Sequence, residues 1–257
     1  MIGKSVGIVL AGGKGKRMHG KVAKQYLPIN GKPMVWYSLN AFDNSPVEAV
    51  VLVVPQGDIA YCREEIIEKY GIKKVRAVIE GGEHRYDSVY NALEVCVQKG
   101  YELVAIHDGA RPLVSVEVIT EALNAAQNTG ACAIAVPEKN TIKIADKNGF
   151  AVRTLPRDVL WSMQTPQAFR FDLCKTAYDR MMEEGADREG ITDDAMAVER
   201  FTDRKVKLNM GDYRNIKVTT PEDLVIAAAY LAENQEMQTS LFGKYPDSVV
   251  NIKGNSV

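Results

Sequence analysis

Short runs of apolar residues alternate along the chain with longer stretches in which apolar positions recur at helical spacing. Each short run is rich in β-branched residues and ends near Pro, Gly or Asp, which predicts a buried strand. The predicted strands are residues 6–10, 49–54, 75–79, 103–107 and 131–136. The predicted helices between them are residues 34–42, 61–70, 88–98 and 116–128. This alternation predicts an α/β fold of Rossmann-like type, with a mostly parallel twisted sheet and helices on both faces.

The pattern changes after residue 137. Residues 138–161 are polar and contain two β-like pieces joined by the turn Asp-Lys-Asn-Gly, which predicts a β-arm that projects from the sheet. A bare hairpin is marginally stable in water, so we expect the arm to pack on a second subunit and form a homodimer. Further elements are predicted as helices at 171–184, 192–201 and 221–233 and a strand at 206–210. We therefore expect one domain over residues 1–235, followed by a loosely attached tail, 236–257.

Composition narrows the classes of partner. The chain has 257 residues, of which 46% are hydrophobic and 25% charged, and its net charge is −1. A chain with so little net charge is not expected to bind nucleic acid or an anionic membrane through bulk attraction. The four cysteines show no zinc-ligand spacing, which favours reduced core thiols in a cytoplasmic protein. No apolar stretch approaches the roughly 18 residues that a membrane span needs.

A glycine-rich loop follows the first predicted strand. Ala11, Gly12, Gly13 and Gly15 lie in this loop, where glycines permit a tight turn and bring backbone N–H groups against an anion. Five cations follow, at Lys14, Lys16, Arg17, Lys21 and Lys24. Such a cluster of like charges is favourable only next to an anion, so the loop predicts a phosphate site. The P-loop pattern and a clean dinucleotide fingerprint are both absent, which argues against a dinucleotide oxidoreductase.

The sequence of this loop and of the segment after it matches a specific known pattern. Residues 11–18 read AGGKGKRM, and KQYLPI and GKP follow at 24–29 and 31–33. These segments resemble the sugar-phosphate nucleotidyltransferases and, within them, the 2-C-methyl-D-erythritol 4-phosphate cytidylyltransferases of the non-mevalonate isoprenoid pathway. Further segments in the family's order extend the resemblance to about residue 231. The resemblance implies CTP and a small polyol phosphate as substrates, and Mg²⁺ or another divalent cation as cofactor.

A second glycine segment, GGEHRYDS at 81–88, follows the third predicted strand. Glycines beside polar side chains suit a flat base that lies against the backbone. The resemblance assigns recognition of cytosine to Gly82, Glu83 and Ser88. The alternative for Ser88 is a cap on the helix that follows.

HDGARP at 107–112 follows the fourth predicted strand. A carboxylate at the end of a parallel strand is well placed to hold Mg²⁺ between phosphates, and the resemblance gives this role to Asp108. Gly109 stands where the family usually has alanine, and we expect it to contact the nucleotide. Arg111 is a candidate acceptor ligand, with a structural ion pair as the alternative. His107 is interpreted as a packed histidine.

The remaining candidates come from the arm and the C-terminal third. The resemblance implies that Arg157 and Thr141 of the arm hold the acceptor across a dimer interface, and guanidinium geometry suits a phosphate. Thr192, in GITDDA, contacts the acceptor or caps the following helix. Lys217, in NIKVTTPEDL, is implied as a cation on the reacting phosphate. Arg214 stands where the family often has an acidic residue.

Together these motifs predict a cytidylyltransferase in which the acceptor's phosphate oxygen attacks the α-phosphorus of CTP and pyrophosphate leaves. Arg17, Lys24 and Lys217 would stabilise the charge on the phosphates. Two alternatives stay open at this point. One is a different acceptor, such as ribitol 5-phosphate, and the other is a catalytically inactive nucleotide-binding module.

Overall fold

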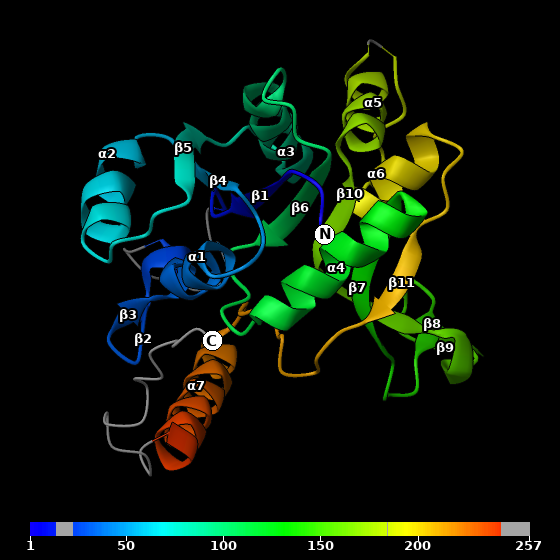
Figure 1. The fold of residues 1–257 in the computed structure, drawn as a ribbon. Helices are drawn as coiled ribbons and strands as arrows, with labels where there is room; N and C mark the ends of the chain where they lie inside the picture. Colours follow the sequence, from blue (N-terminus) through cyan, green and yellow to red (C-terminus); the bar gives the residue numbers. More distant parts are fainter. Residues whose placement is uncertain (14–22, 184, 243–257) are drawn as a thin grey trace, which may run out of the picture.

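A seven-stranded sheet forms the centre of the fold in the computed structural model, which describes residues 1–13, 23–183 and 185–242 and side chains as far as residue 233 (Figure 1). The strand order is β11-β7-β10-β6-β1-β4-β5, and every pairing is parallel except the two made by β10. The strands are β1 (Ser5–Leu10), β4 (Ala49–Val54), β5 (Val75–Glu80), β6 (Leu103–Asp108), β7 (Ala131–Pro137), β10 (Trp161–Arg170) and β11 (Lys207–Met210). The prediction of a mostly parallel sheet is therefore confirmed.

Helices cover both faces of this sheet (Figure 1). The helices are α1 (Met34–Asp43), α2 (Ile59–Tyr61) with the π-helical turn η3 (Cys62–Glu68), α3 (Arg85–Cys96), α4 (Val116–Thr129), α5 (Phe171–Met182), α6 (Asp194–Phe201) and α7 (Pro221–Phe242). One buried cluster joins α1, η3 and α4 to one face, and a second joins α3, α5 and α6 to the other. Because strand side chains alternate between faces, β1 places Val9 in the first cluster and Val6 and Ile8 in the second.

The central strand β10 was not predicted, although the other six strands of the sheet were. Its sequence, WSMQTPQAFR, contains a proline and three buried polar residues, Gln164, Thr165 and Gln167, which argues against a central strand. The structure accommodates them in two ways. The pairing with β7 shifts register between Met163 and Gln167, and each of the three polar side chains has a hydrogen-bond partner.

Helix α7 packs away from the main sheet, below α1 in Figure 1. It covers a third cluster that includes Ile29, Met34, Tyr37 and Val218. Its backbone extends to Phe242, beyond the predicted end at residue 233 and into the predicted tail. Residues 243–257 of that tail lie outside the described part of the chain.

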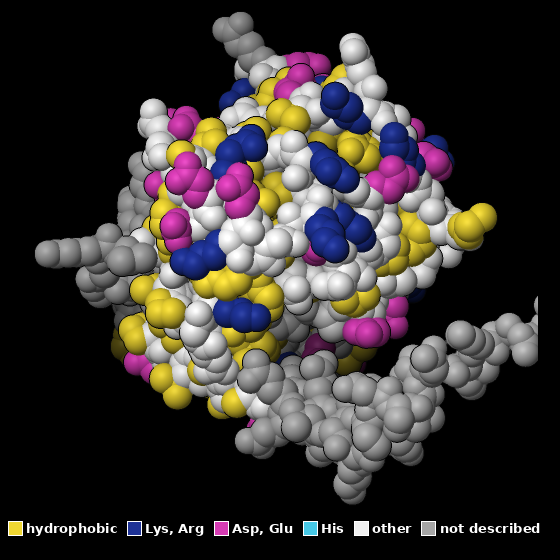
Figure 2. Space-filling view, turned by 60° about the vertical axis from the view of Figure 1, so that its left-hand side comes forward, with side chains coloured by type: hydrophobic (Ala, Val, Ile, Leu, Met, Phe, Trp, Pro, Cys, Tyr) yellow, Lys and Arg dark blue, Asp and Glu magenta, His cyan; other side chains and the backbone are white. Residues whose placement is uncertain are grey.

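Residues 143–154 form a separate hairpin of β8 (Lys143–Ala145) and β9 (Ala151–Thr154), as the turn sequence predicts. Gly149 has a φ of +87° and closes the turn through its N–H to the carbonyl of Asp146. Every residue of both strands is exposed. On the face drawn in Figure 2, Lys and Arg side chains are interspersed with acidic and hydrophobic ones. Within the described residues, no helix has both the length and the apolar character needed to cross a bilayer.

Candidate active site

The carboxyl ends of β1, β4, β5 and β6 meet at one edge of the sheet, where backbone hydrogen bonds join the segments that follow them. The bonds run from Ala11 N to Val53 O (2.7 Å), from Gly81 N to Val54 O (2.8 Å) and from Gly109 N to Leu10 O (2.8 Å). Segments far apart in the sequence thus come together at the edge where parallel sheets bind ligands. The nucleotide candidates Ala11, Gly12, Gly13, Gly82 and Gly109 lie on these segments.

Close approach of the backbone explains Gly109 but not Gly12. A Cβ on Gly12 would lie 3.5 Å from the carbonyl oxygen of Val54, in ordinary contact. A Cβ on Gly109 would lie 3.1 Å from the carbonyl oxygen of Leu10, so a side chain there requires its neighbours to move. Gly109 therefore suits the local packing where the family usually has alanine. Gly15 and Arg17, both predicted at the phosphates, lie in residues 14–22, outside the described part of the chain.

Ser88 holds the second glycine segment in shape. Its hydroxyl accepts a hydrogen bond from the N–H of Gly82 (3.1 Å) and donates to the carbonyl of His84 (3.2 Å). Asp87 closes the start of α3 by accepting from the N–H of His84 (2.8 Å). Ser88 lies inside α3, whose N-cap is His84, so the alternative that Ser88 caps this helix is wrong, although its side chain does have a structural role. Glu83 is exposed. Contact of Gly82, Glu83 and Ser88 with a base stays a prediction.

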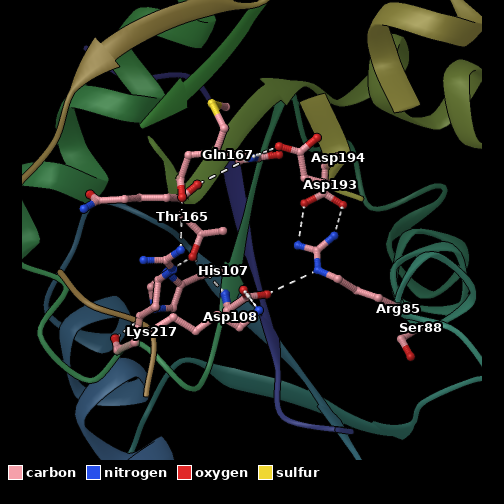
Figure 3. Close-up of polar contacts among 12 residues, drawn as sticks. Arg85, Ser88, His107, Asp108, Thr165, Gln167, Asp193, Asp194 and Lys217 are labelled. Carbon is pink, nitrogen blue, oxygen red and sulfur yellow. Dashed lines mark hydrogen bonds and ion pairs between the residues drawn. The ribbon is translucent and has the colours of Figure 1, made fainter. Parts of the chain in front are cut away.

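Asp108, the last residue of β6, lies between two cations (Figure 3). Its Oδ2 is 2.7 Å from Nζ of Lys217, and its Oδ1 accepts a hydrogen bond of 3.2 Å from Nε of Arg85. Burial alone would raise the pKa of this carboxyl, but Arg85 and Lys217 outweigh it and hold the pKa well below its usual range. Asp108 is therefore an anion in a largely water-excluded position.

His107 lies on the opposite side of β6 from Asp108 and is fully buried. The Thr165 hydroxyl, which accepts from the N–H of Asp108 (3.1 Å), is 2.9 Å from Nδ1 of His107. With Nδ1 as the acceptor, Nε2 carries the proton and donates to the carbonyl of Arg111 (3.2 Å). Burial lowers the pKa of His107 to about 4. The prediction of a packed histidine is confirmed, and the lowered pKa means that the ring is neutral at pH 7.

The predicted cations Lys24 and Lys217 approach the same segment of chain. Nζ of Lys24 donates to the carbonyl of Val218 (2.7 Å), next to Lys217. The N–H of Val218 in turn donates to the carbonyl of Ala110 (2.8 Å), which ties this segment to the one after β6. The structure therefore brings together Lys24, Lys217 and Asp108, which lie more than 190 residues apart at the extremes.

Arg111 is buried, and its guanidinium is engaged by the protein backbone. Nη1 donates to the carbonyl of Asn215 (2.7 Å) and Nη2 to the carbonyl of Met163 (3.2 Å). These contacts favour a structural role, with carbonyl oxygens as the partners in place of the expected carboxylate. Its contact with the acceptor stays a prediction.

The other acceptor candidates are not joined to Asp108. Arg157, in the short 3₁₀ turn η4 (Arg157–Val159), donates to the carbonyl of Lys139 (3.2 Å), and Thr141 is exposed nearby in the sequence. Thr192 is also exposed, and the cap of α6 is Asp193, whose carboxylate accepts from the N–H of Met196 (2.9 Å). The alternative that Thr192 caps this helix is therefore wrong, because the cap lies one residue later, at Asp193, and the helix begins at Asp194.

The sequence did not predict the roles of Arg85, which contacts Asp108, and of Asp194, which pairs with Arg85. Arg85 makes a two-pronged pair with Asp194, and Gln167 of β10 binds the residues on both sides of Asp194. Both Arg85 and Asp194 stood within quoted motifs, GGEHR and GITDD. Each is a charged residue inside a motif, and a charged residue without a role in such a motif is the only sign of them in the sequence. Their pairing across 109 residues becomes visible only in the fold.

Arg214, the departure noted from the family pattern, contacts helix α7. Its Nη2 lies 3.3 Å from Oε2 of Glu233, and its guanidinium lies over the ring of Tyr230 at 5.0 Å. The positive charge is thus partly neutralised by α7.

Asp108 offers a carboxylate to a divalent cation at this edge of the sheet. Among the described residues, no cluster of three or more His, Cys, Asp or Glu side chains could hold a metal ion by itself. Mg²⁺ commonly takes one or two protein carboxylates and completes its shell with substrate phosphates and water. The ionised Asp108 beside the phosphate loop fits that kind of site.

Comparison with known proteins agrees with this geometry. Residues 6–233 match the family model described as 2-C-methyl-D-erythritol 4-phosphate cytidylyltransferase. The proteins of that name from Lachnospira eligens and Clostridium botulinum are 47% and 48% identical to this chain. The first alignment covers 87% of this chain and 97% of its relative, and the second covers 85% and 95%.

Solved structures give the same result. The 4-diphosphocytidyl-2C-methyl-D-erythritol synthase from Anaerococcus prevotii matches with a TM-score of 0.77 and 32% identity, over 90% of this chain and 96% of that one. The 2-C-methyl-D-erythritol 4-phosphate cytidylyltransferase from Francisella tularensis matches with a TM-score of 0.72 and 30% identity, over 87% and 98%. This chain therefore belongs to the 2-C-methyl-D-erythritol 4-phosphate cytidylyltransferase family.

Proposed function

We infer that this protein is a cytidylyltransferase that moves CMP from CTP onto 2-C-methyl-D-erythritol 4-phosphate and releases pyrophosphate, a step in isoprenoid precursor synthesis. The observation that carries the inference is the meeting of Lys24, Lys217 and Asp108 beside the glycine segments at one edge of the sheet. The family match identifies the acceptor, and it favours methylerythritol phosphate over ribitol 5-phosphate.

The reaction is a direct displacement at phosphorus. A phosphate oxygen of the acceptor forms a bond to the α-phosphorus of CTP, and the bond from that phosphorus to the bridging oxygen breaks, so pyrophosphate leaves with the electron pair. The nucleophile is already an anion, so no side chain has to remove a proton from it. The protein contributes positioning and charge neutralisation.

Three cations would neutralise charge on different parts of the triphosphate. Lys24 and Lys217 would bind oxygens of the triphosphate, with Lys217 turning from Asp108 to the phosphate, and Arg17 would stabilise the leaving pyrophosphate. The backbone of residues 11–15 would lie against the phosphates, together with Gly109. Gly82, Glu83 and Ser88 would lie against the cytosine.

Asp108 would hold Mg²⁺, which supplies charge neutralisation at the phosphates when it is bound. The carboxylate supports this role because it is ionised and because its partner Lys217 is 42% exposed and free to move toward an incoming phosphate.

The acceptor would be held by Arg157, Thr141, Thr192 and Arg111. Arg157 and Thr141 lie in the predicted arm, residues 138–161, and we propose that they serve the site of a second subunit in a homodimer. Exposed apolar side chains on this segment, among them Phe150 and Val152, support an interface there. The four free, buried thiols support a cytoplasmic location.

The test is release of pyrophosphate from CTP and Mg²⁺ with each of two acceptors, 2-C-methyl-D-erythritol 4-phosphate and ribitol 5-phosphate. We expect turnover with the first and little with the second. Preference for ribitol 5-phosphate would overturn the acceptor, and CTP binding without turnover on either would indicate an inactive nucleotide-binding module.

A further inference from the structure

The two oxygens of Asp108 have different partners. Oδ1 accepts from Nε of Arg85 at 3.2 Å, whereas Oδ2 lies 2.7 Å from Nζ of Lys217 (Figure 3). A phosphate that attracts Lys217 would therefore release Oδ2 and leave Oδ1 where it is. The position of the carboxylate then depends on Arg85.

Arg85 is itself held by a buried carboxylate. Its Nη1 and Nη2 donate to Oδ1 and Oδ2 of Asp194, both at 2.8 Å, in the planar two-pronged geometry that guanidinium and carboxylate share. Asp194 is fully buried, and the hydroxyl of Tyr178 donates to the same Oδ1 at 2.5 Å. Arg85 cannot leave this pair without stranding a buried charge, which is strongly unfavourable.

The central strand β10 fixes Asp194 in turn. Oε1 of Gln167 accepts from the N–H of Ala195 (2.8 Å), and Nε2 of Gln167 donates to Asp193 (2.9 Å). The start of α6 is thus bound on both sides of Asp194. A chain of contacts leads from the rigid sheet through Asp194 and Arg85 to Asp108.

We propose that Arg85 is a positioning residue, anchored by Asp194, that holds Oδ1 of Asp108 so that Oδ2 is the oxygen presented to the Mg²⁺–triphosphate. This inference rests on the proposed role of Asp108 as the metal ligand. Asp194 has a second effect, because its charge cancels that of Arg85 next to the metal position. Arg85 and Lys217 are matched by Asp108 and Asp194, two charges of each sign.

Asp194→Asn separates this role from simple support of the fold. The variant leaves one uncompensated positive charge and frees the guanidinium to take both oxygens of Asp108. Binding of CTP in a chelator should be unchanged or tighter, because the ligand is an anion. The Mg²⁺ concentration that gives half-maximal enhancement of CTP binding should rise by about 10- to 100-fold, the usual effect of losing a group that orients a metal ligand.

Calorimetric titration of CTP with and without Mg²⁺, in the absence of acceptor, measures both quantities. Asp179→Asn is the matched control, since it removes an exposed carboxylate from α5, the helix that carries Tyr178, and should leave both unchanged. Tyr178→Phe, which removes one hydrogen bond and keeps the ring, should shift the Mg²⁺ dependence in the same direction as Asp194→Asn but less. It also keeps the test decisive if Asp194→Asn does not fold.

A rise in the Mg²⁺ requirement, with CTP binding in a chelator unchanged or tighter, supports the inference, whereas an equal weakening of both titrations would show a merely structural role and overturn it. Asp108→Asn distinguishes the two proposals. If Asp108→Asn shifts the Mg²⁺ dependence and Asp194→Asn and Tyr178→Phe do not, the positioning role is wrong. If Asp108→Asn does not shift the Mg²⁺ dependence either, Asp108 is not the metal ligand, and the positioning role proposed for Arg85 is then wrong as well.

Discussion

Lys217 shows how one residue can serve different partners in the free and the substrate-bound enzyme. It neutralises Asp108 in the absence of ligand, and it lies next to Val218, whose carbonyl is held by Lys24. An incoming triphosphate carries more negative charge than one carboxylate and would draw Lys217 away. The side chain is 42% exposed, so this movement disturbs little packing.

Lys217→Ala should therefore lower turnover by about 100- to 1,000-fold, comparable to the loss of one preorganised donor to a developing charge. The melting temperature should fall modestly, because the buried carboxylate of Asp108 loses one of its two cationic partners and keeps Arg85. Steady-state pyrophosphate release at saturating CTP and acceptor is the measurement, with Lys205→Ala, an exposed lysine between α6 and β11, as the control. Near-normal turnover in Lys217→Ala would remove this residue from the mechanism.

At this scale the sequence predicted residues that stand in recognisable motifs and missed those defined by pairing. Asp108, Lys24 and Lys217 were predicted because each lies in a motif, and the fold brings them together. Arg85 and Asp194 were not, because their role depends on a contact between helices α3 and α6. Motif spacing carries no information about such a contact.

The N-terminal cap of helix α6 can be tested directly by substitution. Asp193 caps the helix and also binds Gln167, whereas the hydroxyl of Thr192 has only a weak contact with the sulfur of Met196 at 3.8 Å. Asp193→Ala should cost about 1–2 kcal/mol of unfolding free energy, as for other lost caps. Thr192→Ala should cost less than about 0.5 kcal/mol.

Urea unfolding of the two variants beside the unsubstituted protein measures this difference. Equal destabilisation by Thr192→Ala and Asp193→Ala would contradict the assignment of the cap. A rise in the KM for the acceptor in Thr192→Ala, without loss of stability, would support the proposed acceptor contact of this exposed threonine.

Most central strands of the sheet have the apolar sequence expected at their position, whereas β10 does not. β1, β4, β6 and β7 are largely apolar, and both of their faces are buried, so local sequence predicts them. β10 is just as central, but its buried amides and hydroxyl depend on partners outside the strand, such as His107 and Asp193. Its position is therefore a tertiary effect that a local pattern does not reveal.

Across the whole molecule, the four thiols report on the integrity of the core. All four are free and buried, on both faces of the sheet. Burial raises the pKa of Cys96 and Cys132 to about 12 and raises those of Cys62 and Cys174 as well. Only the thiolate reacts with alkylating reagents, so the folded protein should be inert.

Iodoacetamide at pH 8 should leave the native protein unmodified over a time in which all four cysteines react in urea. Mass spectrometry counts the modified thiols. Because the thiols lie in both buried clusters, the number of modified thiols should rise with urea concentration in parallel with the loss of helix measured by circular dichroism. Rapid modification of any cysteine in the native protein would contradict the packing described for that residue.

The proposed homodimer depends on a single element, the β8–β9 hairpin, which lies in the proposed interface. Phe150 is 72% exposed and Val152 67% exposed, and side chains of this kind are costly to leave in water. The double substitution Phe150→Glu and Val152→Glu should convert a dimer to a monomer in sedimentation experiments. Val225→Glu, at an equally exposed apolar position on α7, should leave the dimer intact.

The double substitution Phe150→Glu and Val152→Glu also tests which subunit holds the acceptor. If Arg157 serves the site of the second subunit, loss of the dimer removes an arginine from each site while leaving the CTP-binding segments in place. The KM for 2-C-methyl-D-erythritol 4-phosphate should then rise by about 10-fold or more, since one charged hydrogen bond is worth roughly 1.5–3 kcal/mol, and binding of CTP should stay unchanged. A monomer with normal KM values would show that each subunit holds its own acceptor, and a variant that stays dimeric would show that the subunits meet elsewhere.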